Sequence, residues 1–200
     1  MDLVNWNDLK HRPPDPRSTA LTIGVFDGVH RGHRALIGRI TAKAPELLPA
    51  VVTFRENPKK IARPGSFEGD ITGFEEKIAL IRSCGAELCV IIDFSRDFST
   101  MDGRSFMEAL CRFLNPAYIA VGAGFRCGYR RDTGAPAFKA LGNERGIEVE
   151  IVEPVMEGGE PVSSSRIRSA LREGRSAEAE KLLGRAVEAA AGCFNRGFKE

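Results

Sequence analysis

Short apolar runs alternate along the chain with segments in which apolar residues recur every three or four positions. The runs at 20–26, 50–54, 88–94, 117–122 and 147–152 are rich in branched side chains and bounded by turn residues, which predicts five strands. The helical spacing predicts helices at 33–40, 72–85, 102–114, 136–145, 163–173 and 177–191. Strands that alternate with helices favour an α/β fold with a mainly parallel sheet and helices on both faces.

The segments outside this alternation set the expected boundaries. Residues 1–19 are polar and proline-rich, which predicts a lead-in rather than a core element. Residues 20–185 form one predicted domain, and 186–200 a C-terminal helix or tail. Residues 55–70 are expected to be a long loop, and Thr72 with Glu75 has the spacing of a capping box.

Composition narrows the class of protein without naming an activity. The chain has 29 basic and 27 acidic residues, a net charge of +2, so nothing indicates bulk binding of nucleic acid. No apolar run approaches the roughly 20 residues of a membrane helix, and the start lacks the layout of a signal peptide. The five cysteines are odd in number and contain no CxxC, which is typical of reduced thiols. We therefore expect a cytoplasmic protein without nucleic-acid or membrane partners.

The turn between the first predicted strand and helix carries the strongest chemical signal. Its residues 27–33 read DGVHRGH, with Gly28 and Gly32 leaving room for a close backbone or ligand approach. A helix that begins directly after a strand points free N–H groups and a positive dipole end at the turn, where phosphate binds. His30 and His33 can place two imidazoles on one side of it. A metal site would need further ligands, and Asp27 is the one nearby candidate, so chelation by this pair is disfavoured.

A second anion-binding pattern lies at the predicted helix 163–173. Ser163, Ser164 and Ser165 precede Arg166 and Arg168. Hydroxyls at a helix start can simply cap it. Three hydroxyls followed by two arginines also offer donors, helix N–H groups and fixed cations to a polyphosphate.

The two patterns together resemble the HxGH nucleotidyltransferase superfamily, and GVFDGVHRGH at 24–33 is most similar to its FMN adenylyltransferase (FAD synthetase) branch. The resemblance covers about 21–185 and implies a Rossmann-like nucleotidyltransferase fold. It implies the transfer of AMP from ATP to FMN, giving FAD and pyrophosphate, with Mg²⁺ held through phosphates rather than by side chains. It implies His30, His33 and Arg168 as catalytic residues, and Gly24, Phe26, Asp27, Gly28, Gly32, Ser163, Ser164, Ser165 and Arg166 as ATP-binding residues.

The same resemblance places the flavin on two loops that depart from the family pattern. The family reads TFxPHP where this chain has Thr53-Phe-Arg-Glu-Asn-Pro58, so an amide replaces a titrating imidazole. The loop 121–134 keeps its glycines and Phe125, but Gly124 replaces a polar residue and Cys127 a Phe. The expected flavin-binding residues are Asn57, Pro58, Gly122, Phe125, Arg126 and Gly128.

Two alternatives share the ATP half of this interpretation. One is a nucleotidyltransferase of the same superfamily with a different phosphorylated acceptor. The other is a catalytically weak flavin- or nucleotide-binding protein, suggested by the departures at Asn57 and Gly124. Many bacterial members of the family continue into a riboflavin kinase domain, and none is expected here, so a separate riboflavin kinase is expected to supply FMN.

Overall fold

A six-stranded parallel sheet forms the centre of the molecule. The computed structural model describes residues 1–11, 15–62 and 64–186. The strands of the sheet are β1 (Asp2–Asn5), β2 (Thr19–Ile23), β3 (Leu48–Phe54), β4 (Leu88–Ile92), β5 (Pro116–Gly122) and β8 (Glu148–Val152). They lie in the order β1-β4-β3-β2-β5-β8, all parallel. The predicted α/β class and parallel sheet are thus confirmed.

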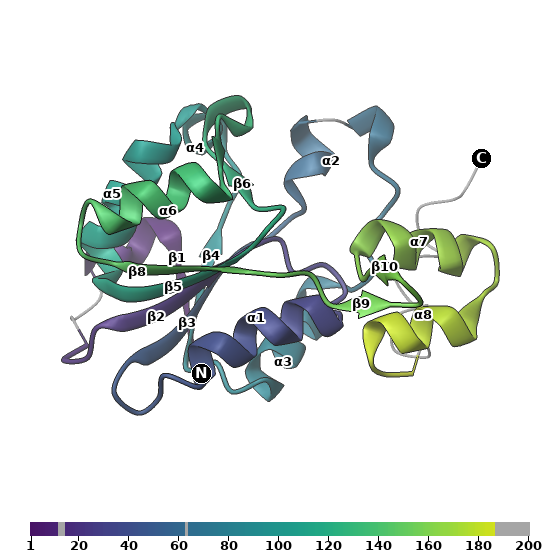
Figure 1. Cartoon of the computed structure of the whole chain (residues 1–200). Helices are drawn as coiled ribbons and strands as arrows, with labels where there is room; N and C mark the ends of the chain where they lie inside the picture. Colours follow the sequence, from purple (N-terminus) through teal and green to yellow (C-terminus); the bar gives the residue numbers. More distant parts are fainter. Residues whose placement is uncertain (12–14, 63, 187–200) are drawn as a thin grey trace.

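Helices cover both faces of this sheet (Figure 1). α1 (Arg31–Thr41) and α3 (Phe74–Ser83) lie on one face, and α5 (Gly103–Leu114) and α6 (Ala135–Asn143) on the other. Alternate residues of each strand serve the two cores: Ala20 packs with the first helix pair, and Leu21 and Ile23 with the second. Burial of a strand on both faces explains why its sequence is an apolar run rather than an alternation.

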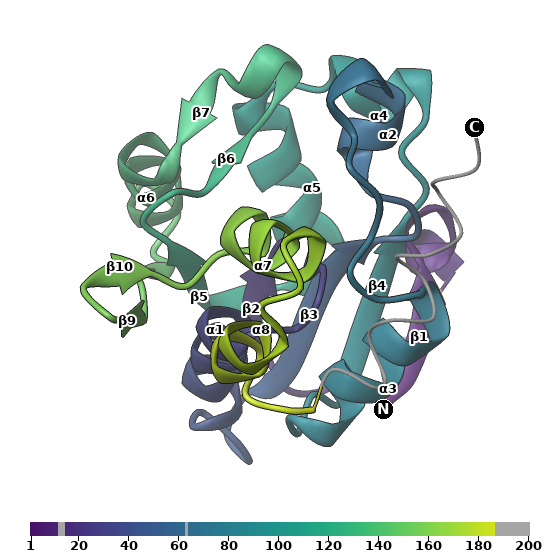
Figure 2. The ribbon, with the colours of Figure 1, turned by 90° about the vertical axis from the view of Figure 1, so that its right-hand side faces the viewer.

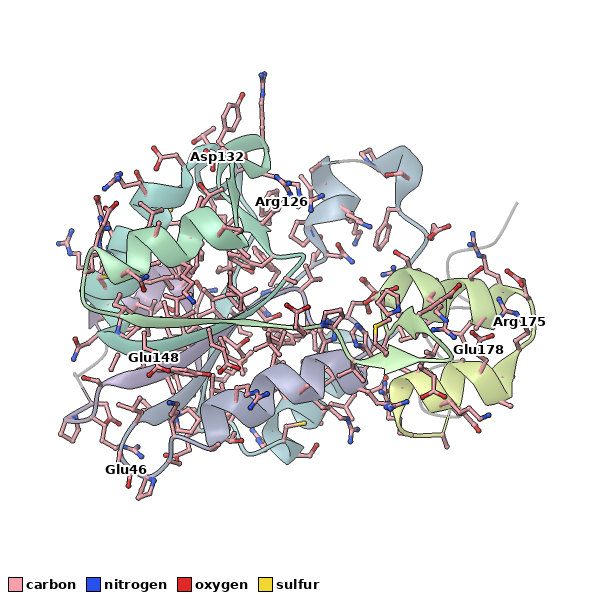
Figure 3. All side chains as sticks on the ribbon, in the orientation of Figure 1. Glu46, Arg126, Asp132, Glu148, Arg175 and Glu178 are labelled. Carbon is pink, nitrogen blue, oxygen red and sulfur yellow. The ribbon has the colours of Figure 1, made fainter. Side chains whose placement is uncertain are left out.

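A helical hairpin completes the molecule beyond the carboxyl ends of the strands. It consists of α7 (Ser164–Arg172) and α8 (Ser176–Leu183), and is preceded by the short pair β9 (Met156–Glu157) and β10 (Glu160–Pro161). Figure 2 shows the hairpin projecting in front of the central strands. A third core of Ile71, Val162, Ile167, Leu182 and Leu183 joins it to the segment before α3. Its outer end carries Arg175 and Glu178, which form an ion pair (Figure 3).

The two long loops predicted from the sequence contain small elements of their own. α2 (Pro58–Ala62) and a 3-10 turn at Pro64–Ser66 lie within 55–70. The 122–134 segment contains the antiparallel pair β6 (Arg126–Cys127) and β7 (Thr133–Gly134), joined by a 3-10 turn at Tyr129–Arg131. The helix α4 (Arg96–Thr100) follows β4. None of the described helices is long and apolar enough to cross a membrane.

The prediction that residues 1–19 are a lead-in is wrong. β1 pairs with β4 at the edge of the sheet, and a 3-10 helix at Trp6–His11 buries Leu9 in the core. An edge strand has one neighbour, so it keeps polar side chains such as Asp2 and Asn5, and the strand pattern is lost. The residues 12–14 of the proline-rich stretch lie outside the described part.

Three predicted ends also shift. The first strand ends at Ile23 rather than Phe26, and Phe26 itself has a φ of 54°, outside the range of strand residues. The capping box is absent: Gly73 is the N-cap of α3, and the hydroxyl of Thr72 accepts the Gly28 N–H instead. The last helix ends at Leu183, where Gly184 adopts a φ of 70°. Positions 187–191 of that prediction lie outside the described residues.

Candidate active site

A cleft of about 1400 Å³ opens at the carboxyl ends of the strands. Its walls come from the segments that follow β2, β3, β4, β5 and β8, and from the start of α7. The chain moves outward from β2 through β3 to β4 and then returns to β5 on the other side of β2. Ligands of open parallel sheets bind at such a reversal of strand order. The cleft is therefore where the topology places a substrate.

The turn after β2 is shaped by its backbone. Gly28 has a φ of 82°, and Phe26 and Val29 have φ values of 54° and 37°, which non-glycine residues seldom adopt. A Cβ at Gly28 would meet Ile71 at 3.1 Å, and one at Gly24 would meet the Phe26 ring at 3.2 Å. The glycines of this motif thus allow close packing of the turn against its neighbours.

His30 and His33 lie side by side at the start of α1. Their rings stack with centroids 3.6 Å apart and an 18° angle between the planes. His30 is the N-cap residue, and its Nδ1 accepts the His33 N–H at 3.4 Å. A Cβ at Gly32 would approach the His30 ring at 3.1 Å, so the glycine leaves space for the imidazole. Because Nδ1 of His30 accepts, its proton resides on Nε2, the donor that remains for a ligand.

Both imidazoles are held neutral. Burial lowers the pKa of His30 to about 4, helped by the cations Arg185 and Arg168. Burial also lowers the pKa of His33 well below its usual value, with smaller contributions from His30 and Lys77. Nδ1 of His33 is buried and has no hydrogen-bond partner among the described residues. Near neutral pH the pair offers uncharged N–H donors.

Asp27 joins three parts of the site. Its Oδ1 accepts the N–H groups of Ile71 and Thr72, at 2.8 and 3.3 Å, and its Oδ2 accepts from Arg168. The Arg168 guanidinium also donates to the Gly69 carbonyl at 2.9 Å. Burial raises the pKa of Asp27 while the Arg168 cation opposes the rise. This buried ion pair fixes α7 against the turn after β2.

The serine segment serves the fold as well as the cleft. Ser163 caps α7 by accepting the Arg166 N–H, and the Ser164 hydroxyl donates to the Asp27 carbonyl at 3.0 Å. Ser165 is exposed and lines the cleft. The start of α7 therefore faces the same space as the start of α1, and two helix N-termini point toward one anion-binding region.

The other end of the cleft is apolar. Its wall contains the rings of Phe54, Phe94, Phe98, Phe106 and Phe125. Asn57 and Pro58 border it on one side, and Gly122, Arg126 and Gly128 on the other. Arg126 lies on β6, on the side that faces α2 (Figure 3). A cluster of aromatic rings beside an anion site suits a flat ring system that carries a phosphate.

The cleft brings together most of the residues singled out in the sequence. Those that line it are Gly24, Phe26, Asp27, His30, Gly32, His33, Asn57, Pro58, Gly122, Phe125, Arg126, Gly128, Ser163, Ser164, Ser165 and Arg168. Gly28 and Arg166 do not line it. Arg166 is turned away and bonds to Glu178 and to the carbonyls of Glu157 and Glu160, so its position does not suit a phosphate contact.

Two polar residues near the site were missed. Lys77 is buried beneath the turn after β2, and Arg185 donates to the Gly28 carbonyl at 2.6 Å. A lysine within the apolar stripe of Phe74, Ile78 and Ile81 was a readable signal for the first. Arg185 follows the last described helix, and its sequence context carries no such signal.

A parallel α/β sheet here holds a histidine-bearing turn and a second helix N-terminus over one cleft, an arrangement that suits the binding of phosphate groups. The model of the FAD synthetase family matches residues 12–166. The bifunctional riboflavin kinase/FMN adenylyltransferase of Escherichia coli K12 is 33% identical over 167 residues, 82% of this chain and 53% of its own. The protein of the same name from Bacillus subtilis 168 is 32% identical over 170 residues, 83% of this chain and 53% of its own.

A solved structure shares the fold of this chain. A crystal structure described as a macrolide-efflux protein from Streptococcus pneumoniae superposes with a TM-score of 0.79 at 29% identity, covering 92% of this chain and 60% of that one. The chain belongs to the FAD synthetase family. It spans about half the length of the curated relatives it matches.

Proposed function

We propose that this chain transfers AMP from ATP to FMN, forming FAD and pyrophosphate. The observation that carries the proposal is the cleft, which places the histidine pair and two helix N-termini at one end and an aromatic wall at the other. Membership of the FAD synthetase family supports the same reaction. A phosphorylated flavin would lie with its ring on the aromatic side and its phosphate toward the histidines.

In the proposed reaction an oxygen of the FMN phosphate attacks the α-phosphorus of ATP. A new P–O bond forms there, and the bond to the bridging oxygen breaks, so pyrophosphate leaves with that bonding pair. The protein supplies no nucleophile, and positioning with charge stabilisation carries such transfers. His30 and His33 would donate N–H groups to the α-phosphate oxygens, which bear the growing negative charge. Neutral imidazoles suit this role because each already carries an N–H that can donate, so neither ring has to be protonated first.

The β- and γ-phosphates would bind at the start of α7. Its free N–H groups and the Ser164 and Ser165 hydroxyls would donate to them. Arg168 already bonds to Asp27 and Gly69, so its other N–H groups would supply a fixed cation at the edge of the site. We do not retain Arg166 as a phosphate ligand, because its donors are bonded to other groups.

Mg²⁺ is part of the proposal as a partner of the ATP phosphates. No group of three His, Cys, Asp or Glu residues suited to a metal occurs among the described residues. A donor set of hydroxyls and substrate phosphates fits Mg²⁺, which keeps its waters and binds few side chains. When bound, it would neutralise charge on the departing pyrophosphate. The FMN substrate would be supplied by a riboflavin kinase activity. The cytoplasmic location that the sequence suggests stays a prediction.

The direct test supplies the purified protein with FMN, Mg²⁺ and ATP, and follows FAD by chromatography together with pyrophosphate. We expect the two products in equal amounts. Flavin binding without pyrophosphate would instead identify a binding protein. Pyrophosphate released with another phosphorylated acceptor, and not with FMN, would identify a related transferase.

The matched variant for this assay is His33→Ala. We expect kcat to fall by roughly 10²–10³, the size of losing one transition-state donor. Thermal unfolding of both proteins controls for loss of the fold. A variant with the wild-type rate would show that His33 does not act on the transition state.

A further inference from the structure

Lys77 is a charged residue buried close to the active site without touching its cleft. Its exposed fraction is 6%, and it lies on the inner face of α3 beside Ile78 and Ile81. An ammonium group removed from water is costly unless it is bonded. Burial accordingly lowers the pKa of Lys77, while the carboxylates of Asp70 and Asp27 and the nearby Cys89 oppose the change.

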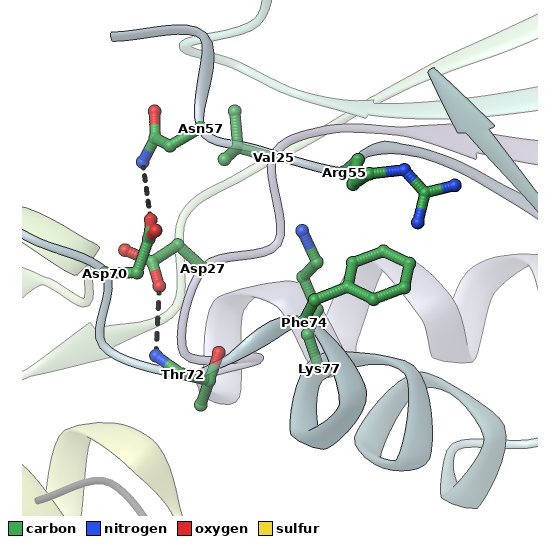
Figure 4. Close-up of a pocket in the computed structure, with 8 residues that line it drawn as sticks. All are labelled: Val25, Asp27, Arg55, Asn57, Asp70, Thr72, Phe74 and Lys77. Atoms are coloured by element: carbon green, nitrogen blue, oxygen red, sulfur yellow. Dashed lines mark hydrogen bonds between the residues drawn. The ribbon is translucent and has the colours of Figure 1, made fainter. Parts of the chain in front are cut away.

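The bonds of Lys77 point to a defined task. Its Nζ donates to the carbonyl of Phe54, the last residue of β3, at 2.6 Å. Around it is a small space of about 20 Å³ that also borders Asp27, Asn57 and Asp70. Figure 4 shows Lys77 rising from α3 toward Val25 and the start of the segment that contains Arg55 and Asn57. The space is about the size of one water molecule, and the polar side chains of Asp27, Asn57 and Asp70 border it.

The same small space touches both halves of the active site. Val25 and Asp27 belong to the turn after β2, and Asn57 to the segment after β3. These three residues also line the large cleft, so they form the wall between it and Lys77. Asn57 is itself held from behind, since its amide donates to Asp70 at 3.4 Å and its oxygen accepts the Lys59 N–H.

We propose that Lys77 is a positioning residue that aligns the acceptor segment (residues 55–62) with the histidine turn. Its ammonium group binds the carbonyl of Phe54, three residues before Asn57. Its positive charge also offsets the negative charges of Asp27 and Asp70. The alignment sets where the acceptor phosphate meets the α-phosphate of ATP. A misplacement of about 1 Å at such a point costs about 10²-fold in rate. The inference rests on the proposed function for its substrate, FMN.

The test replaces Lys77 by Met, which keeps the length of the chain and removes the charge and the donors. Lys139→Met on the exposed surface of α6 is the matched control. FMN affinity is measured by quenching of flavin fluorescence, and ATP affinity by calorimetry. We expect the Kd for FMN to rise at least tenfold with the Kd for ATP within twofold, and kcat to fall 10–100-fold. Lys77→Arg should recover part of the FMN affinity, because it restores the cation and a donor.

A double-mutant cycle with Asn57→Ala separates alignment from general stability. If Lys77 acts through the acceptor segment, the two changes should be less than additive in FMN affinity. Equal losses of FMN and ATP affinity, or unchanged FMN affinity in Lys77→Met, would overturn the proposal. If Lys77→Met shows the expected split between FMN and ATP affinity while the wild type makes no FAD, the proposed function alone would be refuted. Absence of FMN binding to the wild type would overturn both.

Discussion

Burial keeps the two imidazoles of the candidate active site neutral. His30 lies at the start of α1 near the cations Arg168 and Arg185. His33 stacks against it, and the ring centroids of His33 and Phe26 lie 5.1 Å apart. A protonated pair at 3.6 Å would place two like charges in contact. Of the two cations nearby, Arg168 lines the cleft, whereas Arg185 is bonded to the Gly28 carbonyl and to Glu76.

This arrangement makes stability depend on pH in a stated direction. The pKa of His30 is about 4 in the folded protein, against 6.5 when exposed. Between these values the unfolded chain takes up a proton that the folded one refuses, so stability falls as the pH is lowered. When the pH is lowered from 7 to 5, we expect the neutral state of His30 to reduce the free energy of unfolding by about 2 kcal/mol. Urea unfolding at both pH values measures it.

The control for that prediction is His30→Asn, whose side-chain oxygen can still cap α1. The variant should lose less stability over the same interval, because carboxylates titrate alike in both proteins. An identical pH dependence of the two would mean that His30 is not held neutral by the fold.

At the scale of elements, the sequence predicted most of the strands and helices whose residues carry a local periodic pattern. Five strands and six helices were found because buried strands and amphipathic helices leave periodic patterns. The predicted capping box at Thr72 does not form, because the Thr72 hydroxyl accepts a hydrogen bond from the distant Gly28 N–H instead. The motif residues were readable, whereas the bonds of Arg166 and Lys77 depend on segments far away in the chain.

The small hairpin of β6 and β7 depends on one glycine. Gly128 has a φ of 83°, and a Cβ there would meet the Asp132 carboxylate at 2.0 Å and the Gly103 N at 2.7 Å. Gly128→Ala should therefore displace the hairpin and raise the KM for FMN about tenfold, with the KM for ATP unchanged. Steady-state kinetics with each substrate varied in turn measures the split.

Gly146→Ala is the matched control, since Gly146 has a φ of 71° but no atom within 4 Å of an added Cβ. It should cost about 1 kcal/mol of stability through backbone strain and leave both KM values unchanged. If Gly128→Ala also left both KM values unchanged, the close contact of a Cβ with Asp132 and Gly103 would have no effect on FMN binding.

At the scale of the whole molecule, the amino-terminal segment supports the far wall of the cleft. The Trp6 ring lies 5.8 Å from Phe98 and 5.8 Å from Phe106, centroid to centroid, and both phenylalanines line the cleft. A segment expected to be peripheral thus packs behind the aromatic wall of the cleft. The reason it was missed is that its partners, β4 and α5, follow much later in the sequence.

Trp6→Ala tests this support. We expect a loss of about 2 kcal/mol in unfolding free energy, below the 3–5 kcal/mol of a fully buried ring. We also expect a higher KM for FMN, because Phe98 and Phe106 lose their backing. Leu3→Ala, at a side chain that is 50% exposed, should change neither quantity. A stability loss with an unchanged KM would limit the segment to a structural role.

The strand order also bears on how the chain is made. On the ribosome β1 emerges long before β4, its one neighbour in the sheet, which begins at Leu88. At roughly 5–20 residues per second, synthesis takes several seconds to reach that partner. β2 and β3 can pair well before then. Nascent chains stalled before residue 88 therefore expose their amino-terminal strand to proteases and chaperones, and chains stalled well beyond it shelter that strand at the sheet edge.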